Sequence, residues 1–127
     1  MGNKEKGANA ERELLKMFVE AGYMAVRVAG SGMLPEPSCD LLAGKGEKKW
    51  AIECKTCKGS KKYLDKEQIK RFRYFCKIFG LEPLLAIKFN RQGWFFLHPE
   101  KLERTGKGLA ISLEAARRGL SFAQLVK

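Results

Sequence analysis

The sequence predicts an α/β fold in which a mixed central β-sheet is flanked by helices. Its elements follow the order helix, three strands, helix, two strands and short terminal helices, which suggests helices packed on the faces of a sheet. The 127 residues suit a single domain with one hydrophobic core, and 45% apolar residues are typical of a globular chain. We therefore expect one domain spanning residues 1–127.

The first half of the chain is expected to begin with a basic tail, residues 1–7. Residues 8–21 place Leu and Phe side chains on one helical stripe, and Gly22 follows as a C-terminal stop signal. Residues 23–28 resemble a strand. The glycines and prolines of residues 29–38 mark a loop that leads into a hairpin.

The middle of the chain predicts a basic connection at residues 58–62 and then a helix. Asp65 followed by Gln68 resembles a capping box, and Gly80 closes the helix. This helix has an apolar face and a positive face. The apolar face consists of Ile69, Phe72, Cys76 and Phe79. The positive face consists of Lys66, Lys70, Arg73 and Lys77.

The last part of the chain predicts a second hairpin and two short helices. Residues 83–89 and 93–98 resemble strands joined by a turn at residues 90–92. A short helical segment is expected over about residues 110–127, with helices at 113–118 and 122–126.

The charge of the chain points to a polyanionic partner. Twenty-five Lys and Arg against fourteen Asp and Glu leave +11 at pH 7, a large self-repulsion for a small domain. Nucleic acid is the leading partner, because the basic residues do not gather on one amphipathic helix that would bind a membrane. Solubility is the alternative explanation for the charge.

No apolar run approaches the roughly 20 residues that span a bilayer, and the polar N-terminus does not resemble a signal peptide. We expect a cytoplasmic protein with no membrane segment. Its four cysteines, Cys39, Cys54, Cys57 and Cys76, are then expected to be thiols unless the source is a hyperthermophile.

The first hairpin carries two acids and a lysine at an informative spacing. With a two-residue turn at 45–46, Asp40 lies opposite Ala51 and diagonal to Glu53. Alternate strand residues share a face, so Glu53 and Lys55 project to the same side as Asp40. Diagonal positions are roughly 7 to 8 Å apart, close enough for two carboxylates to hold one cation.

Such a cluster suits phosphodiester hydrolysis. Carboxylate oxygens are hard ligands that fit Mg²⁺ or Mn²⁺. Lys55 could orient the attacking water, lower its pKa, or neutralise charge in the transition state. The alternative is a solvated strand face with an ion pair, and the spacing by itself is a weak pattern.

Glu11 supports the catalytic interpretation. It occupies the stripe of Leu14, Leu15 and Phe18, so this acid faces inward. We expect it to reach the metal or a metal-bound water. Pairing with the dipole at the helix N-terminus is the structural alternative.

Five segments together resemble the archaeal Holliday junction resolvases of the PD-(D/E)xK nuclease superfamily. They are KGANAERELL, VRVAGSG, CDLLAG, AIECK, and LLAIKF followed by GWFF. The resemblance covers about the first 98 residues. It implies a restriction-endonuclease-like nuclease fold, a homodimer, Mg²⁺ dependence, and symmetric paired nicks across a four-way DNA junction.

The resemblance also assigns roles to individual residues. It implies Glu11, Asp40 and Glu53 as catalytic acids and metal ligands, and Lys55 as the catalytic lysine. Ser31 matches a serine that assists cleavage in some members. Arg12 and Arg27 match DNA-contacting positions. Cys39 precedes Asp40 where the superfamily name leads one to expect proline.

Other patterns carry weaker interpretations. Lys58, Lys61 and Lys62 adjoin the expected site, so we expect them to contact DNA phosphates. Cys54 and Cys57 form a CxxC, but a second CxxC is absent and His98 is the single histidine, which disfavours zinc. The competing functions are another repair or restriction-type nuclease of this superfamily and a non-catalytic DNA-binding module.

Overall fold

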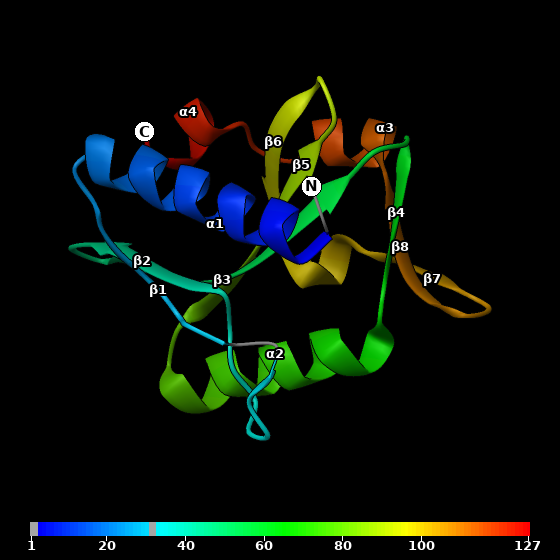
Figure 1. Cartoon of the computed structure of the whole chain (residues 1–127), viewed down its shortest axis with the longest axis horizontal. Coiled ribbons are helices and arrows are strands. Elements are labelled where there is room, and N and C mark those ends of the chain that lie inside the picture. The colour runs from blue at the N-terminus through cyan, green and yellow to red at the C-terminus, as the bar shows by residue number, and fades with distance from the viewer. Residues whose placement is uncertain (1–2, 31–32) are drawn as a thin grey trace.

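The computed structural model describes residues 3–30 and 33–127, which form two β-sheets with flanking helices (Figure 1). The larger sheet has the strand order β1-β2-β3-β5-β6. β3 and β5 run parallel, whereas the other neighbours are antiparallel, so the predicted mixed sheet is confirmed. Its strands are β1 (Met24–Arg27), β2 (Leu41–Lys45), β3 (Lys48–Cys57), β5 (Glu82–Phe89) and β6 (Gly93–Leu97).

A smaller sheet lies beside one end of the larger one, at the right of Figure 1. It has the order β4-β8-β7, and its strands are β4 (Lys61–Leu64), β7 (Glu103–Thr105) and β8 (Gly108–Ser112). This sheet was not predicted: residues 58–62 were expected to form a connection, and the helical segment expected over about residues 110–127 is wrong for residues 110–112, which belong to β8. The strands are three to five residues long, and β4 pairs with β8 from far along the chain, so little local signal marks them.

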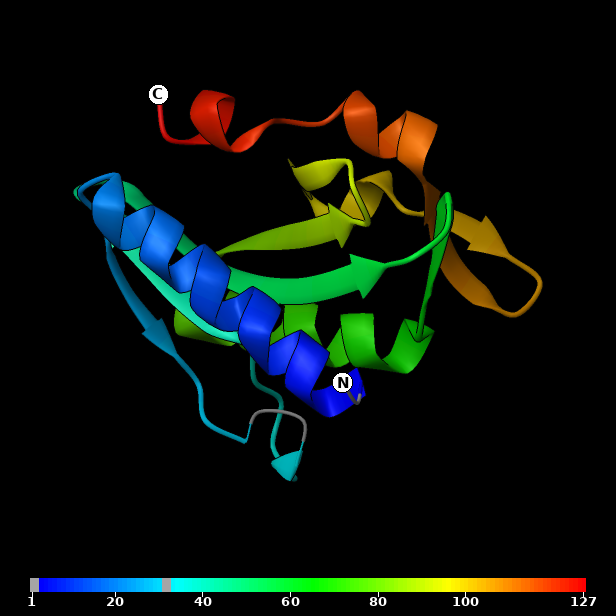
Figure 2. The same cartoon turned by 45° about the horizontal axis from the view of Figure 1, so that its top comes forward.

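The two long helices lie on opposite faces of the larger sheet (Figures 1 and 2). One buried cluster joins α1 to Ile52 of β3, and the other joins α2 to Ala51. None of the helices in the described ranges is long and apolar enough to span a membrane. The helices are α1 (Asn3–Glu20), α2 (Lys66–Phe79), α3 (Leu113–Arg117) and α4 (Phe122–Leu125), with a short 3₁₀ turn, η2 (Pro99–Lys101).

Helix α1 begins earlier than predicted. It starts at Asn3, so residues 3–7 are helical and the expected basic tail is wrong for them. Gly7 weakens a helix by about 1 kcal/mol relative to alanine, but the neighbouring Lys, Glu and Ala residues favour it. Leu14 and Phe18 are fully buried, as the apolar stripe predicts.

The caps of helix α2 are those that the sequence predicts. The Asp65 side chain accepts hydrogen bonds from the backbone N–H groups of Glu67 and Gln68, and Gly80 ends the helix in the left-handed conformation. The capping box is incomplete, because the Gln68 side chain accepts a hydrogen bond from Lys55. The first turn of α2 is therefore linked to β3 through Gln68 and Lys55.

The apolar stripe of α2 is shorter than predicted. Ile69, Phe72 and Cys76 are buried, but Phe79 is 60% exposed. Phe79 lies in the last turn beside a shallow apolar groove that also includes Met24 and Val26 of the edge strand β1. The sheet ends there, so no further strand covers the phenyl ring.

The β2–β3 hairpin has a different turn from the predicted one. Lys45 pairs with Lys48, so the turn is Gly46–Glu47, and Gly46 has φ 60°. A positive φ at the first central position is typical of a type II′ turn, which favours glycine there. Because Leu41 then pairs with Ile52, the preceding residue, Asp40, lies beside Glu53 and not opposite Ala51.

The remaining elements follow the predictions closely. β5 and β6 form a hairpin through residues 90–92, and Arg91 in this turn has φ 66°. The two short C-terminal helices end within one residue of their predicted limits. Ser121 and Gln124 form a complete capping box at the start of α4.

Candidate active site

Asp40 sits where β2 diverges from β3. Its Oδ2 accepts a hydrogen bond of 2.8 Å from the backbone N–H of Cys54, a β3 residue beyond the last β2 partner. The Asp40 carboxylate thus replaces the carbonyl that a continuing strand would offer. This bond fixes the carboxylate against β3 at the point where the two strands separate.

Glu53 is a buried acid beside Asp40. It is 5% exposed and sits in the middle of β3. Burial, followed by the neighbouring negative charge of Asp40, raises the pKa of Glu53 to about 8, although Lys55 opposes the shift. A cation bound at this position would favour the ionised form of Glu53.

Lys55 occupies the same face of β3 as Glu53. Its Nζ lies 3.5 Å from Glu53 Oε2 and donates a 2.6 Å hydrogen bond to Gln68 Oε1 in the first turn of α2. The ammonium group is therefore held between a strand acid and a helix amide. Asp40, Glu53 and Lys55 come together on one side of the sheet, as the alternation along β3 predicts.

The two acids open into a cavity of about 300 Å³ between the sheet and α2. Three further acids, Glu36, Asp65 and Glu67, line it. Arg71 lies on the same wall, and its guanidinium donates to the carbonyl of Pro35 at 2.6 Å. An acidic cavity in a strongly basic chain is a suitable place for a divalent cation.

Lys55 faces a different hollow, the basic groove. This groove of about 690 Å³ runs between the N-terminal part of α1 and the β3–β4 connection. Lys58, Lys61 and Lys62 line it. The acidic cavity and the basic groove meet at the Glu53–Lys55 pair, so a phosphate in the groove would lie next to the carboxylates.

Glu11 faces inward, as predicted, and its carboxylate pairs with Arg27. Its Oε1 accepts a 2.7 Å hydrogen bond from Arg27 Nε, and the pair is largely shielded from solvent. In residues 3–30 and 33–127, no three His, Cys, Asp or Glu side chains form a group that could hold a metal. Glu11 therefore does not complete a three-ligand group with Asp40 and Glu53 in the described part of the chain.

The other expected contact residues are scattered around the site. Arg12 is exposed on α1 and its guanidinium lies 3.4 Å from the Asn9 side chain. Lys61 forms a 2.8 Å ion pair with Glu103 of β7, whereas Lys58 is exposed and Lys62 half-buried. Ser31 lies outside the described residues.

The four cysteines are free thiols, and two of them, Cys39 and Cys54, lie on different faces of the sheet. Cys39 packs into the α2 cluster, whereas Cys54 packs against the α1 cluster, so they do not share a face. The backbone N–H of Asp40 donates a hydrogen bond to the carbonyl of Ile52, although Ile52 already pairs with Leu41. Asp40 and Leu41 thus both oppose Ile52, and this bulge interrupts the alternation of side chains between the two faces of the sheet. Burial raises the pKa of Cys39 to about 12.

Gln68 was not predicted from the sequence as a partner of Lys55. Asp65 and Gln68 were interpreted only as a helix cap, and the contact with Lys55 spans thirteen residues. The local signal for this contact was the position of Gln68 in the first turn of the predicted helix. The contact depends on which side of α2 packs against β3, and the local sequence does not specify that side.

Comparison with known proteins gives consistent matches over nearly the whole chain. A sequence model of the family described as archaeal Holliday junction resolvase matches residues 2–127. A crossover junction endodeoxyribonuclease from Archaeoglobus fulgidus, Hjc, is 38% identical over 122 residues, which are 96% of this chain and 90% of the relative. A crossover junction endodeoxyribonuclease from Saccharolobus solfataricus, Hje, is 38% identical over 104 residues, 80% of this chain and 77% of the relative. The solved structure of Archaeoglobus fulgidus Hjc, described as a Holliday junction resolvase, superposes with a TM-score of 0.88 at 36% identity, covering 95% of this chain and 100% of that one.

Proposed function

Because the chain belongs to the archaeal Holliday junction resolvase family, we propose that it resolves four-way DNA junctions as a metal-dependent endonuclease, with Asp40, Glu53 and Lys55 at its catalytic centre. The observation that carries this proposal is the buried Glu53 beside Asp40, with the Lys55 ammonium 3.5 Å away. The sequence resemblance supports these three residues, together with Glu11 and Ser31.

Asp40 and Glu53 fit a divalent cation. Their carboxylates are adjacent and open into an acidic cavity, and burial together with the charge of Asp40 raises the pKa of Glu53. Oxygen ligands of this kind favour Mg²⁺, and Mn²⁺ is a plausible substitute. The ion would supply the charge that activates water and offsets negative charge on the phosphoryl oxygens.

Lys55 has a distinct part in the reaction. Its ammonium is held by Gln68 and Glu53, so it can donate to the attacking water or to a phosphoryl oxygen without first changing conformation. Water attack forms one P–O bond, and one P–O bond of the DNA backbone breaks. Because Lys55 also borders the basic groove, it would meet a phosphate that lies along Lys58 and Lys62.

Glu11 and the DNA-contacting residues have supporting roles in this proposal. Glu11 would join the metal environment through a water, while its ion pair with Arg27 holds both groups next to the site. Arg12, Lys58, Lys61 and Lys62 would contact DNA phosphates, and Arg27 would do so if its pair with Glu11 opens. A role for Ser31 in cleavage rests on the family resemblance alone.

The substrate argues for a homodimer. A four-way junction with two-fold symmetry needs two equivalent nicks, and an isologous dimer presents two equivalent sites. The apolar groove at β1 and the end of α2 offers a surface for pairing, since Met24 is 82% exposed and Phe79 60%. We place the enzyme in the cytoplasm, where four free thiols suit a reducing compartment.

The decisive experiment compares cleavage of a mobile four-way junction and of a linear duplex, with Mg²⁺ or with EDTA. Wild type is expected to cut the junction in paired nicks only with the metal. Asp40→Asn and Glu53→Gln, which keep the side-chain shapes, are expected to bind the junction but to lose at least about a hundredfold in cleavage rate.

Three outcomes would contradict parts of the proposal. Full activity in either variant would refute the metal assignment. Preferential cutting of the linear duplex would indicate a repair or restriction-type nuclease, and binding without any cutting would indicate a DNA-binding module.

A further inference from the structure

The basic groove beside Lys55 does not end at the catalytic centre. Lys6 and Ala10 of α1 and Thr56 and Cys57 of β3 line both this groove and a second hollow of about 200 Å³. The second hollow reaches the β5–β6 turn at Arg91. A continuous depression therefore leads from the candidate site, across the N-terminal part of α1, to the tip of a hairpin.

Arg91 is held at this tip in a conformation that most residues avoid. Its φ is 66°, in the left-handed region, and Arg91 is the one non-glycine with positive φ among the residues that the structure describes. Glycine would occupy this position with less strain. Strained backbone of this kind is more frequent at functional positions than elsewhere.

The turn that carries Arg91 is anchored to the site's own strand. The backbone N–H of the neighbouring Asn90 donates a 2.8 Å hydrogen bond to the carbonyl of Cys57, at the end of β3. β3 also carries Glu53 and Lys55. The turn is therefore positioned by the strand that bears the catalytic residues.

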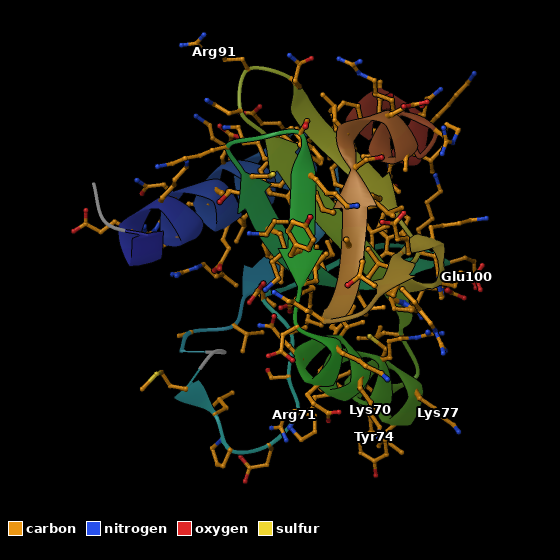
Figure 3. The ribbon with its side chains drawn as sticks, turned by 90° about the vertical axis from the view of Figure 1, so that its right-hand side faces the viewer. Lys70, Arg71, Tyr74, Lys77, Arg91 and Glu100 are labelled. Atoms are coloured by element: carbon orange, nitrogen blue, oxygen red, sulfur yellow. The ribbon has the colours of Figure 1, made fainter. Side chains whose placement is uncertain are left out.

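Two cations along this depression, Arg91 and Lys6, have no acidic partner among the described residues, whereas Lys55, Lys61 and Lys88 are paired. In the described ranges the side chains of Arg91 and Lys6 make no hydrogen bond or ion pair. Glu13, the acid in the second hollow, is engaged by Lys88 at 2.9 Å and by Trp94 at 2.6 Å. Figure 3 shows Arg91 projecting from the tip of the turn into solvent, far from the labelled residues of α2.

We infer that Arg91, together with Lys6, holds a backbone phosphate of the DNA arm that leaves the active site along this depression. This inference rests on the proposed function because it takes DNA as the bound polyanion. It does not require that the protein cleaves the DNA. An extended polyanion lying past Lys55 would meet Lys6 and then Arg91, and both cations are available to it. Such contacts fix the position of the DNA without reading its sequence.

The test measures DNA affinity in EDTA, over a range of salt, for the full-length protein and its variants. Arg91→Gln and Arg91→Gly both remove the charge, and the glycine also relieves the backbone. Both are expected to bind a four-way junction roughly fivefold more weakly. A plot of log affinity against log salt has a negative slope, and its magnitude should decrease by about one for each protomer that makes the contact.

Two variants serve as matched controls. Arg91→Lys keeps the charge and is expected to bind within about twofold of wild type. Lys107→Gln removes a cation from another hairpin turn, whose side chain lines neither hollow, and is expected to leave the salt slope unchanged. The thermal midpoint of Arg91→Gly should equal or exceed that of wild type, so weaker binding would not reflect a damaged fold.

The inference is overturned if Arg91→Gln and Arg91→Gly bind with wild-type affinity and salt slope, or if Lys107→Gln weakens binding as much as they do. The same loss is expected on a linear duplex, because the contact is made to the backbone. A protein that binds DNA but fails to resolve junctions would refute the proposed function. The affinities of wild type and the Arg91 variants would still decide whether Arg91 contacts the DNA.

Discussion

At the scale of single residues, the candidate site depends on one costly arrangement, a buried glutamate beside an aspartate. Burial and the Asp40 charge favour the protonated form of Glu53, and Lys55 offsets this only in part. A divalent cation would remove the repulsion. The site therefore destabilises the folded state most when the Glu53 carboxyl group is ionised and no metal is bound.

This arrangement predicts how the stability of the metal-free protein depends on pH. The pKa of Glu53 is raised from 4.5 in the unfolded chain to about 8 in the fold, so its contribution to stability is present at low pH and lost as pH rises to about 8. In EDTA, Glu53→Gln should gain in thermal midpoint relative to wild type between pH 5 and pH 8.5, by about 4 °C or more.

Metal should reverse that difference. Excess Mg²⁺ or Mn²⁺ at pH 8.5 is expected to stabilise wild type but not Glu53→Gln. A constant difference between the two proteins from pH 5 to pH 8.5, as followed by circular dichroism, would show that Glu53 does not titrate in this range.

At the scale of elements, helix α2 positions the lysine as well as covering the sheet. Asp65 caps its first turn, and Gln68 in that turn accepts the hydrogen bond of Lys55. The sequence predicted the cap from residues three positions apart. It did not predict the contact with Lys55, which depends on how α2 packs against β3.

Loss of this cap should therefore affect both stability and catalysis. Asp65→Ala leaves the N–H groups of Glu67 and Gln68 without their acceptor and should cost about 1 kcal/mol, lowering the thermal midpoint by roughly 4 °C. A frayed first turn should also loosen Gln68 and slow junction cleavage.

Asp65→Asn is the matched control. It keeps an acceptor at the cap but removes a charge from the acidic cavity, and is expected to retain most of the stability. Equal thermal midpoints for Asp65→Ala and wild type would show that water replaces the cap without cost.

At the scale of the whole molecule, charge and apolar surface lie in different places. The basic groove adjoins the N-terminal part of α1 and the β3–β4 connection, whereas the exposed apolar side chains of Met24, Val26 and Phe79 gather at β1 and the end of α2. A homodimer formed through the apolar groove would leave the basic groove of each protomer open to DNA.

The proposed dimer is tested by changing that apolar surface. Met24→Glu combined with Phe79→Glu would bring like charges into the interface, and is expected to shift the protein from dimer to monomer in sedimentation equilibrium. Leu120→Glu changes a residue that is 44% exposed outside this groove, and should leave the dimer intact. A monomeric wild type, or a dimeric double variant, would contradict the proposed interface.

The sequence by itself determined the features that depend on neighbours a few positions apart. Alternation along β3 placed Glu53 and Lys55 on one face, the spacing of Leu14 and Phe18 defined the buried side of α1, and Asp65 with Gly80 set the limits of α2. The interactions behind these features are local, and residue type largely decides them.

The tertiary structure decided what depends on partners distant in the chain. The type II′ turn at Gly46–Glu47 brought Asp40 beside Glu53, β4 found its partner in β8, and Glu11 paired with Arg27. Each outcome depends on which surfaces pack together and which charges meet when they do. A run of residues does not contain that information, because several partners fit the same local pattern until the core excludes all but one.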